Sequence, residues 1–385
     1  MNLEKKIFYW SPFLVPIATP RAVINSAYAM RKFSKKNKCY ILNFFGEFNI
    51  FKDEIEKKNL SLINYFNQNI LNFLPKHGKI QSRFSFIVMF ILSFFPLKKL
   101  ISEKKPDYFV IHLITSLPLV LLLLFKFRTK FILRISGLPR LGFFRKLLWK
   151  IAFKKIHLIT CPSQATLNYI NSLNIVNSKK VQLLHDPIID VKKILQSKKN
   201  TTDKITLNEK DYFFAAGRLT KQKNFIFLCN AFKKVLLKYP DLKLVIAGEG
   251  EDKKKILSLI KQNNLENKIF LIGYIQNIFY YMSRSKGFVL SSLWEDPGFV
   301  LVEAAFCRVP VFSSDCSSGP KELIKEDING ILFSSNNLDN FVKKFDKFLK
   351  LEKDLNKLIL NNLKMSKKFT LFNHYATFKK ILKGV

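Results

Sequence analysis

The chain has 385 residues, more than one hydrophobic core usually serves, so two domains are expected. An apolar content of 48% excludes a disordered protein, and a formal net charge of +37 indicates anionic partners such as nucleic acid, anionic lipid or anionic small molecules. The 5 cysteines and 5 histidines show no metal-binding spacing, so we expect no metal site and reduced, mostly buried thiols in a cytosolic protein.

The first half of the chain alternates short apolar runs with helical patterns. The lysine-led apolar run at its start resembles a signal peptide, but Pro12 and Pro16 interrupt the run and favour a first buried strand. Strands are predicted at residues 7–10, 39–45, 108–112, 130–135 and 157–161, and helices at residues 22–33, 117–127, 143–154 and 165–173. This alternation is typical of a parallel sheet with helices on both faces.

Residues 84–95 and 113–125 form two further apolar runs. Each has about 12–13 residues, short of the ~20 that a membrane-spanning helix needs. Two interpretations stay open: a core helix, or a helix at the membrane interface. Four lysines follow the first run, as expected where cations meet lipid phosphates: Lys98, Lys99, Lys104 and Lys105.

A polar, lysine-rich stretch at residues 192–205 is predicted to be a linker. The alternation then resumes, with strands at residues 212–216, 242–247, 269–272, 287–291 and 309–313, helices at residues 224–239, 252–263 and 299–306 and from residue 319, and a helical tail at residues 338–382.

The pattern therefore predicts an α/β fold of two doubly wound, Rossmann-like domains that face each other across a cleft. The expected boundaries are 1–191 for the first domain, 192–205 for the linker, 206–365 for the second domain and 366–385 for a final helix, which could cross back to the first domain. Ligands of such sheets bind at the carboxyl ends of the strands, so residues that end strands or begin helices are the candidates.

The strand at residues 212–216 leads directly into a basic loop. Gly217 permits a tight turn, Arg218 offers a two-pronged donor to a diphosphate, and Lys223 adds a second positive charge. Lys221 is interpreted as a solvent-exposed residue, because a chain this rich in lysine has many of them.

A pair of glutamates flanks the next candidate. Glu295 follows the strand at residues 287–291, and a Pro-Gly turn then starts a helix, so the backbone N–H groups of Gly298, Phe299 and Val300 would form an anion-binding or hydroxyl-binding mouth. Glu295 and Glu303 can accept hydrogen bonds from sugar or ribose hydroxyls. The structural alternative is that Glu303 only complements the helix dipole.

These motifs resemble the C-terminal domain of glycosyltransferase family 4 (group 1), retaining enzymes of the two-Rossmann-domain (GT-B) type that include bacterial surface-polysaccharide and O-antigen glycosyltransferases. The match covers residues 215–333. Its motifs are Gly217-Arg218-Leu219, Lys223-Asn224, Gly248-Glu249-Gly250, Glu295 with Glu303, and Ser318-Gly319-Pro320-Lys321-Glu322.

The resemblance implies roles for these residues. Arg218 and Lys223 would stabilise the leaving nucleoside diphosphate, Glu303 would bind the ribose hydroxyls and Glu295 the donor sugar. The Gly298–Val300 amides would meet the sugar and phosphates, and the base would lie near Gly273 and Ile275. No third glycine follows Gly248 and Gly250, so nicotinamide or flavin binding is not expected.

The first half resembles the family less closely. A Gly-Gly loop often follows the first strand in family members, whereas this chain has residues 16–20 with two prolines there. His112 ends a strand on the cleft side, so it is a candidate to position or deprotonate the acceptor hydroxyl, although a lone histidine is often structural.

The sequence thus predicts a retaining glycosyltransferase of the hexosyltransferase type, without a cofactor or metal. Its partners would be a nucleotide-sugar donor, a polyprenyl-diphosphate-linked or other lipid-linked acceptor, or a polysaccharide, and the anionic inner face of the cytoplasmic membrane. A soluble acceptor is the main alternative. A basic nucleic-acid-binding protein is a weaker one, because no recognition motif for nucleic acid is present.

Overall fold

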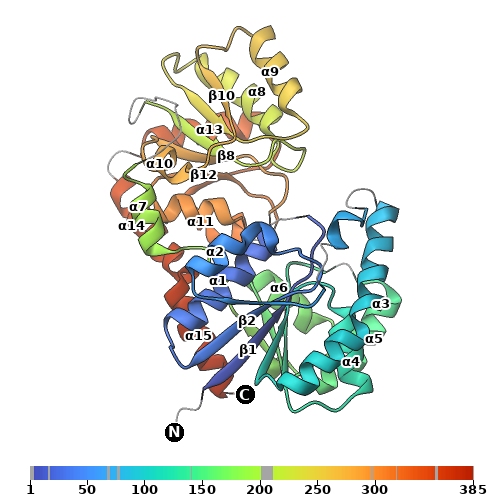
Figure 1. Ribbon diagram of the computed structural model, residues 1–385. Coiled ribbons are helices and arrows are strands. Elements are labelled where there is room, and N and C mark those ends of the chain that lie inside the picture. Colours follow the sequence, from blue (N-terminus) through green and yellow to red (C-terminus); the bar gives the residue numbers. More distant parts are fainter. Residues whose placement is uncertain are drawn as a thin grey trace. The chain divides into compact units, whose positions relative to one another are not determined.

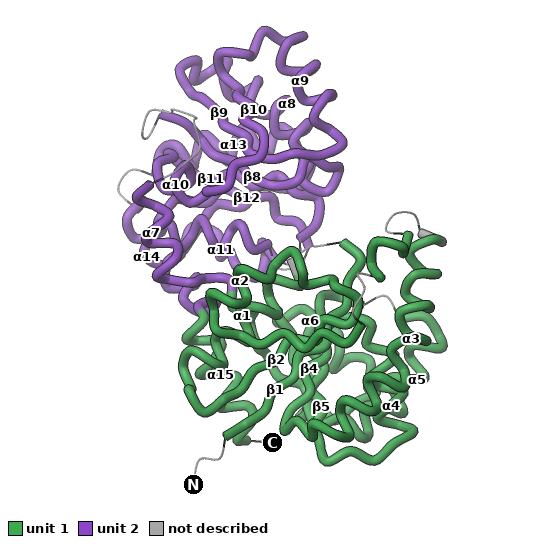
Figure 2. The backbone as a smooth tube through the Cα atoms, viewed as in Figure 1, with its two compact units in different colours: residues 1–187, 371–385 green, residues 188–370 purple. Residues whose placement is uncertain are grey.

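The computed structural model of the chain describes residues 4–15, 18–66, 70–75, 79–139, 141–200, 211–295, 298–317, 319–351 and 354–384. It divides into two compact units, shown in Figure 2: unit 1 comprises Met1–Pro187 and Leu371–Val385, and unit 2 comprises Ile188–Thr370. Each unit contains one parallel sheet with helices on both faces, so the predicted pair of Rossmann-like domains is confirmed.

Unit 1 contains a seven-stranded sheet with the order β3-β2-β1-β4-β5-β6-β7. Its strands are β1 (Lys5–Trp10), β2 (Asn37–Asn43), β3 (Ser61–Asn64), β4 (Tyr108–Ile111), β5 (Lys130–Arg134), β6 (Leu158–Cys161) and β7 (Val181–Leu183). Strand β1 pairs with both β2 and β4, so the first apolar run is a central buried strand, as predicted.

Alternate side chains of β1 enter two separate cores. Phe8 and Trp10 belong to one core, whereas Ile7 and Tyr9 belong to the other. The helices of unit 1, most of them labelled in Figure 1, are α1 (Ala18–Lys32), α2 (Lys52–Lys57), α3 (Lys79–Lys104), α4 (Ser116–Leu124), α5 (Phe143–Lys155), α6 (Gln164–Ser172) and α15 (Leu371–Gly384), with short 3-10 turns at Asn49–Phe51, Ile70–Asn72 and Ser178–Lys180. Residues of α3, α4, α5 and α6 pack in the first core, and residues of α1, α2 and α15 pack in the second.

Unit 2 contains a six-stranded sheet with the order β10-β9-β8-β11-β12-β13, so β8 and β11 are neighbours. The strands are β8 (Phe213–Ala216), β9 (Leu244–Ala247), β10 (Ile269–Gly273), β11 (Gly287–Leu290), β12 (Val311–Ser314) and β13 (Ile331–Phe333). One face is covered by α8 (Phe225–Leu236), α9 (Lys253–Gln262) and α13 (Leu338–Leu349), and the other by α7 (Val191–Ser197), α10 (Ile278–Ser283), α11 (Phe299–Phe306), α12 (Pro320–Leu323) and α14 (Leu355–Ser366).

The segment predicted to be a linker is partly helical. Helix α7 occupies its first residues and belongs to unit 2, because Asp190 caps the helix and Ile194 is 2% exposed in the core. Its lysines are exposed and only Ile194 is buried. A short amphipathic helix of this kind has the same polar composition as a linker, so composition could not distinguish the two. Residues 201–205 lie outside the described residues.

The two apolar runs lie in helices that differ in burial. The run at residues 113–125 contributes Leu117, Leu119 and Leu121 of α4, which are fully buried, so the core interpretation holds for it. The run at residues 84–95 lies within α3, a helix of 26 residues that continues past Pro96. The expected length was therefore too short, because polar residues on both sides of the run are also helical.

Helix α3 is only partly covered. Met89, Leu97 and Ile101 are buried in the core of unit 1, whereas Ile91 and Phe95 are 64% and 72% exposed. Among the described residues, the segment Gln81–Lys104 of this helix is long and apolar enough to cross a membrane by length and composition, and 33% of its apolar window is buried.

All five cysteines are buried and unpaired, as predicted. Burial raises the pKa of Cys39, Cys161, Cys229 and Cys307 to about 12. Thiols of this kind are poor nucleophiles, so their role is packing.

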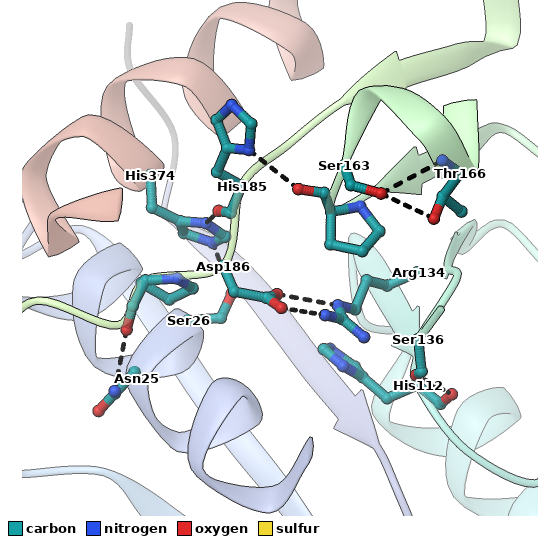
Figure 3. Close-up of polar contacts among 12 residues, drawn as sticks. Asn25, Ser26, His112, Arg134, Ser136, Ser163, Thr166, His185, Asp186 and His374 are labelled. Carbon is teal, nitrogen blue, oxygen red and sulfur yellow. Dashed lines mark hydrogen bonds and ion pairs between the residues drawn. The ribbon is translucent and has the colours of Figure 1, made fainter. Parts of the chain in front are cut away.

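A buried polar network attaches α15 to unit 1 (Figure 3). The ring of His374 interacts through Nδ1 with the carbonyl oxygen of His185 at 2.7 Å and through Nε2 with Oγ of Ser26 at 2.9 Å. Burial lowers the pKa of His374 to about 4. The helix is therefore held by a neutral imidazole.

This network makes stability depend on pH. The pKa of His374 is lower in the folded chain than its ordinary value of 6.5. The neutral ring therefore contributes fully to the stability of the folded chain above pH 6.5, and this contribution is lost as the pH falls towards 4. We expect the free energy of unfolding to fall by up to about 3 kcal/mol over this range. Urea unfolding at pH 4–7 should show a shallower dependence for His374→Gln than for the wild type; equal pH dependences would contradict this role.

Candidate active site

Two loops of unit 2 meet at the carboxyl ends of the neighbouring strands β8 and β11. The backbone N–H of Leu293 donates to the carbonyl oxygen of Gln222 at 2.8 Å, and Oγ of Ser291 donates to the carbonyl oxygen of Lys223 at the same distance. Nε2 of Gln222 also donates to the carbonyl oxygen of Trp294 at 3.0 Å. These bonds fix the loop after β8 against the loop after β11.

Lys223 and Glu295 form an ion pair at this junction. Lys223 Nζ lies 2.5 Å from Glu295 Oε1, and the two side chains are 15% and 7% exposed. Oγ of Ser292 donates to the same carboxylate oxygen at 2.6 Å. A pair so shielded from water is weak evidence of stabilisation, but removing either partner would leave a buried charge without its counter-ion. The sequence predicts both charged residues as part of the site, but no local pattern predicts that they pair.

The glycines of these loops allow close packing. A Cβ on Gly217 would lie 3.2–3.3 Å from the methylene carbons of Lys223, so the lysine side chain runs across the glycine. A Cβ on Gly248 would lie 1.9 Å from the carbonyl oxygen of Gly217, and one on Gly250 would lie 2.4 Å from that of Leu219. The Gly-x-Gly motif after β9 therefore supports the loop that carries Lys223.

Helix α11 begins beside Glu295. Gly298 precedes its first residue with φ of 88°, a conformation that favours glycine, and a Cβ there would meet Glu295 only at ordinary contact distance. Phe299 and Val300 are half-buried in the first turn, where backbone N–H groups lack acceptors within the helix. Glu303 is half-buried one turn further on. Glu295, the Gly298–Val300 backbone and Glu303 thus follow one another within nine residues across the start of α11.

Other predicted residues lie around this junction. Arg218 follows Gly217 and its side chain is exposed. Gly273 ends β10 and its carbonyl oxygen accepts from the N–H of Gly248 at 2.7 Å. The side chain of Ile275 is buried in the core, so it can offer only its backbone to a ligand, whereas Tyr274 beside it is 72% exposed. Residues 296 and 297, which follow Glu295, lie outside the described residues. The same holds for Ser318 and for residues 16 and 17 of the predicted loop after the first strand.

The candidate of unit 1, His112, is more enclosed than expected (Figure 3). It is 4% exposed at the end of β4, and neither ring nitrogen has a hydrogen-bond partner among the described residues. Burial, with smaller contributions from Arg134 and His374, holds the pKa of His112 well below its usual range. A group of such low basicity is better suited to position a ligand than to take its proton.

Arg134 forms a second buried ion pair, which the sequence analysis missed. Its Nε donates to Asp186 Oδ1 at 3.0 Å, and its Nη2 donates to Oδ2. The two side chains are 8% and 4% exposed. The partners lie 52 positions apart, and no motif in the sequence singles out Asp186.

Gly248→Ala tests the packing of the glycine loops. The added methyl group would meet a backbone oxygen that cannot move without shifting the loop of Lys223, so we expect destabilisation by about 1–3 kcal/mol. Gly142→Ala is the control, because nothing lies within 4 Å of a Cβ at that position. Urea unfolding of both variants and the wild type checks this. Equal free energies of unfolding for Gly248→Ala and Gly142→Ala would show that the loop of Gly248 does not need to pack closely against the loop of Gly217.

Comparisons with known proteins identify the family of this chain. Residues 197–365 match the family model of the group 1 glycosyl transferases. An uncharacterized glycosyltransferase of Methanocaldococcus jannaschii is 31% identical over 317 residues, which cover 78% of this chain and 74% of the relative.

Two further proteins are similar over different extents. The N-acetylgalactosamine-N,N'-diacetylbacillosaminyl-diphospho-undecaprenol 4-alpha-N-acetylgalactosaminyltransferase of Campylobacter jejuni is 34% identical over 192 residues, which cover 50% of each chain. The crystal structure of HepE from Anabaena in complex with UDP covers 99% of this chain and 100% of its own, with a TM-score of 0.71 and 14% identity. At that identity the likeness shows the fold, which is GT-B.

Proposed function

The chain belongs to the group 1 glycosyltransferases, and on that premise we propose that it transfers a sugar from a nucleoside-diphosphate donor to a lipid-linked acceptor with retention of anomeric configuration. This is the chemistry of glycosyltransferase family 4. The observation that carries the proposal is the shielded pair of Lys223 and Glu295, which lies in the loops after β8 and β11, with Glu295 beside the start of α11.

The donor is assigned to unit 2. HepE, which has the same fold, was crystallised with UDP, and the loop after β8 of this chain offers the positive groups that a diphosphate needs. Lys223 has three N–H donors, and its bond to Glu295 uses one of them. Arg218 adds a planar, two-pronged donor that is exposed to solvent.

These groups would act on the leaving group. Negative charge grows on the diphosphate as the bond to the sugar breaks. Fixed cations and the N–H groups of Gly298, Phe299 and Val300 would stabilise that charge without a metal ion. We expect turnover to persist in the presence of a chelator.

Glu295 is proposed to hold the donor sugar, and Glu303 the ribose hydroxyls. Oε1 of Glu295 already accepts hydrogen bonds from Lys223 and Ser292. A carboxylate held in this way is better suited to accept hydrogen bonds from sugar hydroxyls than to act as a nucleophile. The acceptor would then attack on the face from which the diphosphate leaves, and a diphosphate oxygen would take the proton.

The acceptor is assigned to unit 1. The name of the Campylobacter relative gives a diphospho-undecaprenol acceptor, and the exposed apolar face of α3 together with a net charge of +37 suits a lipid with phosphate groups. His112, at the end of β4, would position the acceptor. We place the enzyme in the cytoplasm, peripherally bound to the inner face of the cytoplasmic membrane.

Release of nucleoside diphosphate from a panel of nucleotide sugars, with an undecaprenyl-diphosphate-linked sugar as acceptor, tests the proposal. Lys223→Ala and Glu295→Ala should each lower turnover about 100-fold or more, because each removes a group that meets the transition state. Lys243→Ala is the matched control: Lys243 pairs with Asp211 at 2.5 Å near the amino ends of β8 and β9.

Several outcomes would contradict the assignment. Wild-type rates in both site variants would remove the donor site from these loops. Release with soluble sugars alone would favour a soluble acceptor, and a product of inverted configuration would exclude the retaining mechanism.

A further inference from the structure

Unit 1 contains a cavity of about 780 Å³, within the range of small-molecule sites. Helices α3 and α5 form part of its wall, and the segments that follow β1, β4 and β5 form the rest. His112 lies in this lining, so the cavity reaches the candidate residue of unit 1.

The helical walls are apolar and remain exposed. Phe86 and Ile87 of α3 line the cavity and are 39% and 58% exposed. The same face of α3 presents Phe84, Ile87, Ile91 and Phe95, which are spaced three or four residues apart and are at least 58% exposed. An apolar face of this kind on a helix anchored in the core marks a binding surface.

Helix α5 repeats this arrangement. Trp149 is buried at the cavity, whereas Phe144 is 84% exposed, and Leu147 and Ile151 are 47% and 46% exposed. In Figure 1 both helices lie along the same side of unit 1. The cavity is therefore continued outwards by apolar side chains of two helices.

The charge at the cavity has one sign. Arg134 and Arg145 line it, and none of the aspartates or glutamates in the described part of the chain does. Arg134 is already paired with Asp186, whereas Arg145 is exposed. Helix α5 contains five cations and no acidic residue in the sequence FFRKLLWKIAFKK. An anionic group beside a hydrocarbon chain complements this lining.

Two buried polar groups at the cavity lack partners among the described residues. They are Nε1 of Trp149 and the ring nitrogens of His112. Leaving such groups unpaired is unfavourable, and a ligand with oxygen acceptors would offer partners after a small side-chain adjustment.

We propose that this cavity binds the lipid diphosphate part of the acceptor, with the phosphates at Arg145 and the first segments of the hydrocarbon chain on the exposed faces of α3 and α5. The inference rests on the proposed lipid-linked acceptor and assigns its lipid part to a particular site. The occupant is a single lipid diphosphate, not the bulk membrane surface.

Farnesyl diphosphate, a short and soluble isoprenoid diphosphate, is the probe. Its binding to the full chain is measured by titration calorimetry with UDP at saturation, so that the donor site does not contribute. Farnesol lacks the phosphates and inorganic diphosphate lacks the chain, so each should bind at least ten-fold more weakly. Equal binding of inorganic diphosphate would overturn the proposal.

Variants locate the site. Ile87→Asp and Arg145→Glu should each weaken binding of farnesyl diphosphate at least ten-fold, and both positions are exposed, so folding should persist. Leu237→Asp, at a position 84% exposed in unit 2, and Lys254→Glu on α9 are the matched controls and should bind as the wild type does. Wild-type affinity in both cavity variants would overturn the assignment.

Vesicles of phosphatidylglycerol separate the lipid diphosphate from the membrane surface. If the two cavity variants lose flotation with these vesicles but keep farnesyl diphosphate, the surface serves bulk lipid and the proposal is wrong. The two proposals also fail separately. If the wild-type chain binds farnesyl diphosphate but releases no nucleoside diphosphate, only the transferase assignment is wrong. If it transfers sugar but does not bind farnesyl diphosphate, only the assignment of the cavity is wrong.

Discussion

The ion pair between Lys223 and Glu295 organises the candidate site. It joins loops after two adjacent strands, with Nζ and Oε1 2.5 Å apart and both side chains largely shielded from water. The packing of glycines makes the pair possible, since the lysine crosses Gly217 and the loop of Gly217 rests on Gly248. The ammonium group of Lys223 has three N–H donors, and its bond to Glu295 uses one of them. Two donors would therefore remain for a phosphate, so the ion pair does not prevent Lys223 from binding one.

The two units divide the chemistry by the character of their surfaces. Unit 2 offers charged groups and backbone amides at the carboxyl edge of its sheet, where a nucleotide sugar binds in folds of this type. Unit 1 offers exposed apolar helix faces with arginines and lysines beside them, around a cavity that reaches His112. Under the proposed function, the net charge of +37 would serve two different phosphate groups, one in the donor and one in the acceptor.

Much of this arrangement follows from the sequence because it is local. Alternating apolar runs predicted the parallel sheets, and the positions of Arg218, Lys223 and Glu295 after strands placed them at the carboxyl edge. Short elements such as β3, β7 and β13 were not predicted, because three or four residues carry too little periodicity. The bond of Lys223 to Glu295, 72 positions away, and the burial of His112 depend on tertiary packing, which no local pattern encodes.

A double-mutant cycle on donor binding tests the central claim most directly. The affinity for UDP is measured by titration calorimetry in the wild type, Lys223→Ala, Glu295→Ala and the double variant. If the pair organises the site, the two single losses will not add, and the coupling between the residues will be about 1 kcal/mol or more. Additive effects, or unchanged affinity in all three variants, would contradict the account.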